Sequence, residues 1–311
     1  MSSVARADDT RMLNETFLEY LQTPGMEKKA LSAVDDFVRL KVREDGYLRK
    51  WLPPITIGNE DLDRRVESDK PYKILDIEAD SPAAIGVPFG TLPLNVYIRA
   101  KKVPVTFQRF MTPRFTKDVS ELRTYHMDIR QILSDNSIKD ILTAEDSAFT
   151  TAFNAGLVAA DTVVPETGVI QWETIPGGVT RDSMLDALKI MPRTPSRLEA
   201  ATLLVNNITI YEMMKWGRDE FGGDVSEQIA KDGWTMLKIF GRDLMVTIKQ
   251  DLIPDDSMFM GADPKFLGRF YSLEEVTLYV KREAFMLEFF AYEEIGCTIA
   301  NLAAIARADF A

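Results

Sequence analysis

The sequence predicts an α+β protein that combines one long helix with one apolar face and a C-terminal quarter made mostly of strands. Apolar side chains recur at helical spacing over residues 137–157. They are Ile138, Ile141, Leu142, Phe149, Ala152, Phe153 and Leu157. Residues 235–311 hold short apolar runs separated by turn residues, and Val276, Leu278 and Val280 alternate with Thr277, Tyr279 and Lys281. That alternation is the period of a half-buried strand, so we expect mostly short strands here.

Composition excludes some classes of protein. The 311 residues are 46% hydrophobic and 27% charged, with a net charge of −11 from 37 basic and 48 acidic residues. A dedicated nucleic-acid binder usually has a basic domain or stripe, so this balance argues against one. The single cysteine, Cys297, excludes an intrachain disulfide and is typical of a reducing compartment. The length allows one elaborated domain or two.

Neither a secretory signal nor a membrane span is expected. Residues 1–9 contain no apolar segment of the kind that signal peptides carry. The longest uncharged, mainly apolar run, 295–306, is well short of the roughly 20 residues that a spanning helix needs. We therefore expect a soluble protein with no membrane partner.

Residues 1–52 carry two helical patterns. In residues 10–22 an apolar stripe forms from Leu13, Phe17 and Leu21, which are four residues apart. The second pattern runs over residues 26–51 and ends before Pro53, because a residue that precedes proline is pushed out of the α region. Nine basic and nine acidic residues make this segment neutral. The helices could pack on their own domain or on another copy, and the sequence leaves both open.

Residues 53–117 are typical of an extended hairpin. Strand-like runs lie at 72–77 and 96–100, with prolines and glycines between them. Residues 53–96 hold eight acids and four bases, whereas residues 97–130 hold eight bases and three acids. The two charged halves could pair with each other or with adjacent copies. The basic half (Arg99, Lys101, Lys102, Arg109 and Arg114) is the one place where DNA binding could be argued, and its acidic neighbours weaken that reading.

The long helix has a predicted start. Ser137 can cap its N-terminus, and Asp140, three residues later, completes a pattern like a capping box. About twenty residues at 1.5 Å each give a helix of roughly 30 Å. A helix of this length with one apolar face needs a sheet or another helix to cover it.

The middle of the chain predicts helix, strand and helix in that order. Residues 180–191 fit a helix, 203–207 fit a strand that stops at paired asparagines, and 209–216 fit a second helix. A Gly-containing loop at 221–224 then leads to the C-terminal strands.

The C-terminal block carries a resemblance to a known family. The order FGRDLMVTIKQDLIPDDSMFMG, then LYVKREAFMLEFFAYEEIGCTIANLAAIARADF, resembles the end of tailed-bacteriophage major capsid proteins, which have the Hong Kong 97-type fold. The resemblance implies four parts, with the long helix as the spine helix of the third. They are an N-terminal arm (1–52), an extended loop (53–117), a peripheral domain (118–180 and 236–311) and an axial domain (181–235).

The same resemblance implies a structural function. Copies of the chain would form pentamers and hexamers that close into an icosahedral phage head around double-stranded DNA, without sequence specificity and with no cofactor. The protein would be made in the host bacterial cytoplasm and would reside in the virion capsid. Further partners would be a scaffold protein, a portal and a decoration protein. The candidate contact residues between subunits are Leu13, Phe17, Leu21, Lys73, Arg99, Lys101 and Lys102. The alternative is an encapsulin-like nanocompartment shell.

A third class, a soluble α/β enzyme, lacks every catalytic signature. The single histidine, His126, has no nucleophile elbow near it, and no phosphate-binding glycine loop occurs. Cysteine and histidine are too few for a zinc cluster, and no EF-hand spacing is present. The adjacent acid pairs 35–36, 255–256 and 293–294 point apart on a helix or strand, so none predicts a proton-sharing dyad. We therefore do not expect an enzyme.

Overall fold

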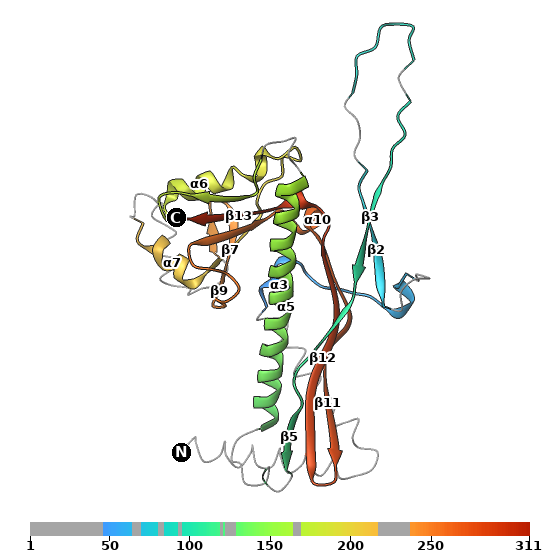
Figure 1. Cartoon of the computed structure of the whole chain (residues 1–311), viewed down its shortest axis with the longest axis vertical. Helices are drawn as coiled ribbons and strands as arrows, with labels where there is room; N and C mark the ends of the chain where they lie inside the picture. Colours follow the sequence, from blue (N-terminus) through green and yellow to red (C-terminus); the bar gives the residue numbers. More distant parts are fainter. Residues whose placement is uncertain are drawn as a thin grey trace.

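The computed structural model describes residues 46–63, 70–79, 84–92, 95–118, 121, 129–163, 169–216 and 237–311. Figure 1 shows one long helix, α5 (Ile129–Val163), beside a long hairpin of β11 (Gly268–Glu283) and β12 (Met286–Ile299). A second sheet with short helices lies at one end of α5, and a two-stranded hairpin extends away from the body. The predicted α+β class is confirmed.

The remaining elements are short. Helical ones are α3 (Tyr47–Trp51), η1 (Asn59–Asp61), α6 (Arg181–Leu188), η2 (Met191–Arg193), α7 (Asn207–Met214), α10 (Pro264–Leu267) and η3 (Leu302–Ala304). The strands are β1 (Ile55–Thr56), β2 (Tyr72–Ile77), β3 (Lys101–Thr106), β4 (Gln108–Met111), β5 (Phe115–Asp118), β6 (Trp172–Ile175), β7 (Thr202–Asn206), β8 (Leu237–Ile239), β9 (Arg242–Thr247), β10 (Ser257–Gly261) and β13 (Ile305–Phe310). No helix in the described ranges is long and apolar enough to cross a membrane.

A five-stranded sheet runs along α5. Its order is β1-β11-β12-β4, and β5 pairs with another part of β12. Val276, Leu278 and Val280 are all buried, so the predicted alternation is confirmed. The expectation of mostly short strands is wrong for this hairpin, because β11 and β12 have 16 and 14 residues. At about 3.3 Å per residue β12 spans roughly 45 Å, close to the roughly 50 Å of α5, so the long helix offers a surface that only long strands can cover.

A six-stranded sheet forms the other half of the core, in the order β6-β13-β10-β7-β9-β8. All five residues of β7 and of β10 are buried, as expected for strands at the centre of a covered sheet. Both 181–235 and 236–311, the segments expected to belong to different domains, contribute strands to it. The two segments therefore share one core.

The start of α5 differs from the prediction. The capping prediction is wrong, because α5 begins at Ile129 and Ser137 lies inside it with a buried side chain. A serine caps a helix only from the position before its first residue, whereas helical backbone lies on both sides of Ser137. The apolar face is confirmed at Ile138, Phe149 and Leu157, whereas Ala152 is exposed. The buried row continues instead to Ala160.

The second strand of the projecting hairpin begins later in the chain than predicted. β2 matches the strand predicted at 72–77 and pairs with β3 from Tyr72↔Thr106 to Ile77↔Lys101. The strand predicted at 96–100 is wrong, because residues 95–100 have no ladder partner and pairing begins only at Lys101. Residues 108–118, which the sequence places in the loop or at its end, pair with β12 as β4 and β5.

The helix–strand–helix prediction for the middle of the chain is confirmed. Thr180 caps α6 and its side chain accepts a hydrogen bond from the Ser183 backbone N–H. β7 ends at Asn206, whose side chain accepts a hydrogen bond from the Thr209 backbone N–H at 2.8 Å and so caps α7.

Candidate functional site

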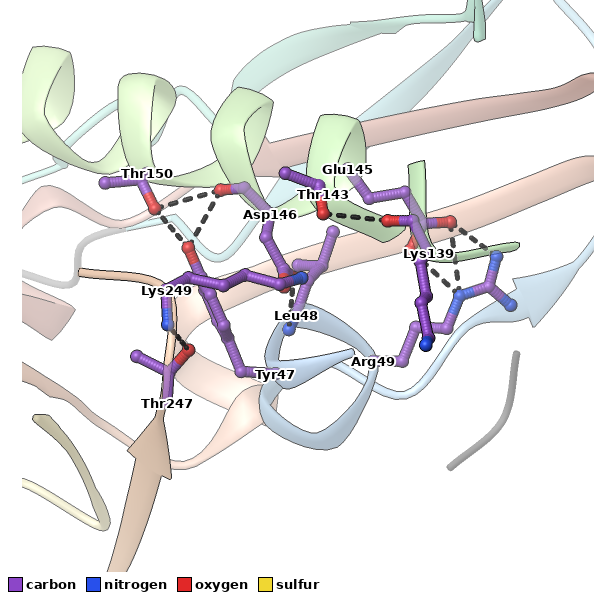
Figure 2. Close-up of polar contacts among 10 residues, drawn as sticks. All are labelled: Tyr47, Leu48, Arg49, Lys139, Thr143, Glu145, Asp146, Thr150, Thr247 and Lys249. Carbon is purple, nitrogen blue, oxygen red and sulfur yellow. Dashed lines mark hydrogen bonds and ion pairs between the residues drawn. The ribbon is translucent and has the colours of Figure 1, made fainter. Parts of the chain in front are cut away.

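The short helix α3 is attached to the middle of α5 by buried charged side chains (Figure 2). Arg49 reaches two acids from different elements. Its Nη2 lies 2.5 Å from Glu145 Oε1 on α5 and 2.9 Å from Glu293 Oε2 on β12. The Arg49 side chain is 8% exposed and both acids are fully buried. Arg49 therefore joins the end of the N-terminal segment to both the long helix and the long hairpin.

A second buried acid, Asp146, ties a third segment to the same place. Its carboxylate accepts hydrogen bonds from the Leu48 backbone N–H at 3.0 Å and from Lys249 Nζ at 2.6 Å (Figure 2). Tyr47 donates from its hydroxyl to the backbone carbonyl of Asp146 at 3.0 Å. Burial raises the pKa of Asp146, and the hydrogen bond and charge of Lys249 oppose that rise. We call residues 47–49, 145–146, 249 and 293 the polar junction.

The ionisable groups of the polar junction have pKa values that are shifted by burial and by one another. Burial and, next, the negative charge of Glu145 raise the pKa of Glu293 to about 10, although Arg49 opposes both effects. Burial alone would lower the pKa of Arg49, but hydrogen bonding and charge from Glu145, with the charge of Glu293, raise it. Two carboxyl groups thus share one guanidinium in a site with little water, where unbalanced charge is expensive.

The polar junction was missed at the level of sequence, although a signal was present. Glu145 stands in the row of Ile141, Phe149 and Phe153, at four-residue spacing, where the pattern predicts only apolar residues. Glu293 stands between Ala291 and Ile295 on the inward face of β12. An acidic residue at a position where the spacing predicts an apolar one is the feature that could have identified both Glu145 and Glu293.

Glu293 and Glu294 point to opposite sides of β12, as the sequence analysis expects for adjacent residues. Glu294 is bound by Arg109 of β4 on the outer side of the sheet, whereas Glu293 faces Arg49. The acid that lies beside Glu293 is Glu145, which comes from a distant segment of the chain.

Aromatic packing completes the attachment of α3. Trp51 is 1% exposed, and its ring lies 5.5 Å, centroid to centroid, from both Phe149 and Phe153 of α5. Gly261 at the end of β10 leaves room for the indole, because a Cβ there would lie 2.5 Å from Trp51 Cζ2. Helix α3 is therefore held by packing as well as by charge.

The hairpin that extends from the body presents an exposed apolar tip. Every described residue from 84 to 100 is exposed, and Figure 1 shows this segment well away from both sheets. The large apolar side chains among them are Ile85, Val87, Phe89, Leu92, Val96, Tyr97 and Ile98, which we call the loop tip. Exposed apolar residues gathered in one place mark a contact surface.

The predicted contact residues fall in two groups. Leu13, Phe17 and Leu21 lie outside the described residues, as does His126. The others lie on the projecting hairpin and find partners within it or near it. Lys73 lies over the Tyr271 ring at 5.4 Å, Arg99 lies over the Tyr97 ring at 5.7 Å, and Lys102 lies 3.7 Å from Asp76. Lys101 is exposed at the last pair of the ladder.

Nothing in the described ranges resembles a catalytic centre. No group of three or more metal-ligating side chains occurs in them. An open pocket of about 790 Å³ lies beside the polar junction, and its charged lining residues are Lys50, Lys139, Lys249 and Asp251. Burial raises the pKa of the Cys297 thiol to about 12, so this thiol is a poor nucleophile at neutral pH.

Comparison with known proteins identifies the fold through structure and not through sequence. No protein-family model matches the chain, and no curated protein matches it. The mature capsid of bacteriophage PhiM1 aligns over 86% of this chain and 87% of its own, with a TM-score of 0.60 at 9% identity. A structure from Microbacterium phage Oxtober96 aligns over 86% of this chain and 92% of its own, with a TM-score of 0.60 at 11% identity. A virus-like particle from Pyrococcus furiosus covers 90% of this chain and 99% of its own, with a TM-score of 0.51 at 14% identity.

Proposed function

We propose that this chain, which has the fold of tailed-phage major capsid proteins, is the major capsid protein of a phage head. Copies would associate as pentamers and hexamers and close into an icosahedral shell around double-stranded DNA. The protein would be made in the host bacterial cytoplasm and reside in the virion. The four parts named from the sequence, arm, extended loop, peripheral domain and axial domain, carry over as part of this proposal.

The observation that carries the proposal is the loop tip. A monomer gains nothing from holding seven large apolar side chains in water at the end of a hairpin. Full burial of a Val, Leu, Ile or Phe side chain contributes roughly 1.5–3 kcal/mol, which becomes available when a second copy covers the tip. A subunit that must associate with copies of itself would have such a surface.

The negative charge of the subunit favours DNA that is enclosed by the shell over DNA that is bound at specific sites. Residues 131–311 hold sixteen basic and twenty-eight acidic residues, so this part of the subunit repels phosphate. The shell and the genome would then be held together by closure and counterions. Scaffold, portal and decoration proteins would be the further partners, and the candidate contacts with other subunits remain those named from the arm and the loop.

A second candidate is an encapsulin-like nanocompartment, a shell that encloses protein. The similarity to a Pyrococcus furiosus structure described as a virus-like particle, with 99% of that chain aligned, supports a shell of the same fold whose description names no phage. The two candidates differ in what the shell contains, and analysis of purified particles for DNA or for a packaged protein separates them.

The test is purification of the chain, alone and with proteins encoded near it, followed by negative-stain electron microscopy. The double variant Phe89→Ser with Leu92→Ser removes apolar surface from the loop tip, and Ile170→Ser is the control at an exposed apolar residue before β6. We expect shells from the wild type and the control, and few or none from the loop-tip variant, with equal melting midpoints for all three. A wild type that stays monomeric under all conditions would overturn the proposal, as would sequence-specific duplex binding that survives physiological salt.

A further inference from the structure

One oxygen of the polar junction lacks a hydrogen-bond donor. Glu293 Oε2 accepts from Arg49 Nη2 at 2.9 Å, but Glu293 Oε1 is buried without a partner among the described residues. Both oxygens of Glu145 accept from Arg49. A buried carboxylate oxygen without a donor is unfavourable, and native structures rarely leave one.

The titratable groups near Glu293 lie on several elements. Arg49 is on α3, Glu145 and Asp146 are on α5, Glu275 is on β11 and Cys297 follows on β12 itself. Strand β4 pairs with β12 at Glu293, and its Arg109 binds Glu294 on the outer side of the sheet. Lys249, after β9, is engaged by Asp146 at 2.6 Å. Arg49 is thus the one cation of the polar junction that contacts Glu145 and Glu293, so two ionised carboxylates would leave a net negative charge in a buried site.

One proton on this pair of carboxyl groups removes both the oxygen without a partner and the excess negative charge. A carboxylic acid has one O–H donor, whereas a carboxylate has none. If Glu293 Oε1 carries a hydrogen, it can donate to the Glu145 carboxylate, the orphaned oxygen gains a partner, and the pair keeps the single negative charge that Arg49 balances. Two carboxyl groups that share a site commonly bind one proton in this way.

We propose that Glu293 is a neutral acid that donates from Oε1 to Glu145, and that this proton holds α3 against α5 and β12. When the proton leaves to solvent, the two carboxylates repel each other and compete for Arg49. The root of the N-terminal segment then loosens, so its attachment to the body depends on pH. The inference concerns the chain itself and stands whether or not the chain forms a shell.

The direction of the pH dependence follows from the pKa of Glu293. Burial and the neighbouring Glu145 together raise this pKa to about 10, far above the roughly 4.3 of an exposed glutamate. The folded state therefore binds a proton that the unfolded state has released over the whole interval between those values. The stabilisation is complete below the pKa of the unfolded state and is lost as pH rises through the pKa of the folded state. Asp146, whose pKa burial also raises, acts in the same direction.

The test compares Glu293→Gln with Glu294→Gln in the full chain, in the assembly in which it is purified. Glutamine retains an acceptor for Arg49 and supplies an N–H for Glu145, so it imitates the neutral acid. Glu294 is the matched control, because it is the next residue, lies on the outer side of β12 and pairs with Arg109. The readouts are the melting midpoint and the hydrogen exchange of the α3 amides from about pH 5 to about pH 9, with exchange corrected for its intrinsic pH dependence.

For the wild type and Glu294→Gln we expect the melting midpoint to fall with rising pH by about 5 °C or more, with loss of protection at the Leu48 and Leu52 amides. Glu293→Gln should keep that protection and show a much smaller slope. An unchanged slope in Glu293→Gln would overturn the proposal. If that variant does not fold, infrared spectroscopy of the wild type at about pH 7 decides the matter. A protonated-carboxyl carbonyl band that shifts on ¹³C-glutamate labelling supports the proposal, and its absence refutes it.

Discussion

Trp51 of α3 lies edge-on against Phe149 of α5, with ring centroids 5.5 Å apart and planes inclined at 63°. This contact brings the end of the N-terminal segment into the same apolar cluster as the central strands of the six-stranded sheet. The attachment of α3 thus belongs to the core and is not a surface contact.

Trp51→Ala is expected to cost about 3–5 kcal/mol of unfolding free energy, because it leaves a large cavity among Phe149, Phe153 and Gly261. Ile55→Ala, at a half-exposed residue of β1, is the control and should cost far less. Equilibrium denaturation measures both. Equal losses for the two variants would show that the indole does not anchor α3.

Gly261→Ala is expected to destabilise the fold by about 1–3 kcal/mol, since the added methyl group would overlap the Trp51 ring. Gly86→Ala is the matched control, because nothing lies within 4 Å of the corresponding Cβ position and the backbone there is not left-handed. Combining Gly261→Ala with Trp51→Leu should cost less than the sum of the two single changes. Full additivity in that double-mutant cycle would contradict the steric explanation.

Asp309→Asn is expected to reduce stability at neutral pH by about 1 kcal/mol. Burial alone would raise the pKa of Asp309, but hydrogen bonds from Trp172, Ser257 and Arg307 lower it below its usual range. The stabilisation is therefore present above the ordinary aspartate pKa and is lost as pH falls through the lowered one. Acid titration of the melting midpoint should show a shallower acid limb in this variant than in Asp243→Asn, an exposed control. Identical acid limbs would count against the prediction.

Deletion of residues 1–25 is expected to leave the melting midpoint nearly unchanged while shell closure fails. The contacts that hold the described part of the N-terminal segment begin at Tyr47, so the deletion leaves them all in place. Calorimetry and electron microscopy on one sample measure both effects. A midpoint lowered by many degrees would instead mean that the stripe of Leu13, Phe17 and Leu21 packs on its own subunit.

The sequence predicted those features that depend on local periodicity. The alternation around Val276 and Leu278 and the strand that stops at Asn206 each arise from a few adjacent residues, and each is present in the structure. The strand expected at 96–100 failed because a strand needs a partner, and β2 ends at Ile77, opposite Lys101. Ser137 failed as a cap because helical backbone already precedes it from Ile129 onward.

The polar junction could not be assembled from local patterns. Arg49, Glu145 and Glu293 come from three distant segments, and only the packing of α3 on α5 and β12 brings them together. The sequence places Glu293 only beside Glu294, its neighbour in the chain. In the structure Glu293 lies beside Glu145, a residue of α5 at a position where the sequence pattern predicts an apolar side chain.

The similar lengths of α5 and of the β11–β12 hairpin have a mechanical consequence. Two stiff elements that lie side by side along much of their length act as a composite beam, which bends only if one slides along the other (Figure 1). Glu145 lies at the middle of α5 and is joined through Arg49 to β12. The polar junction therefore resists sliding of the helix along the hairpin. Beyond the beam, the described part of the projecting hairpin is held together by the six-residue pairing of β2 with β3. Distortion of the subunit would therefore concentrate at the β2–β3 neck and leave the beam straight.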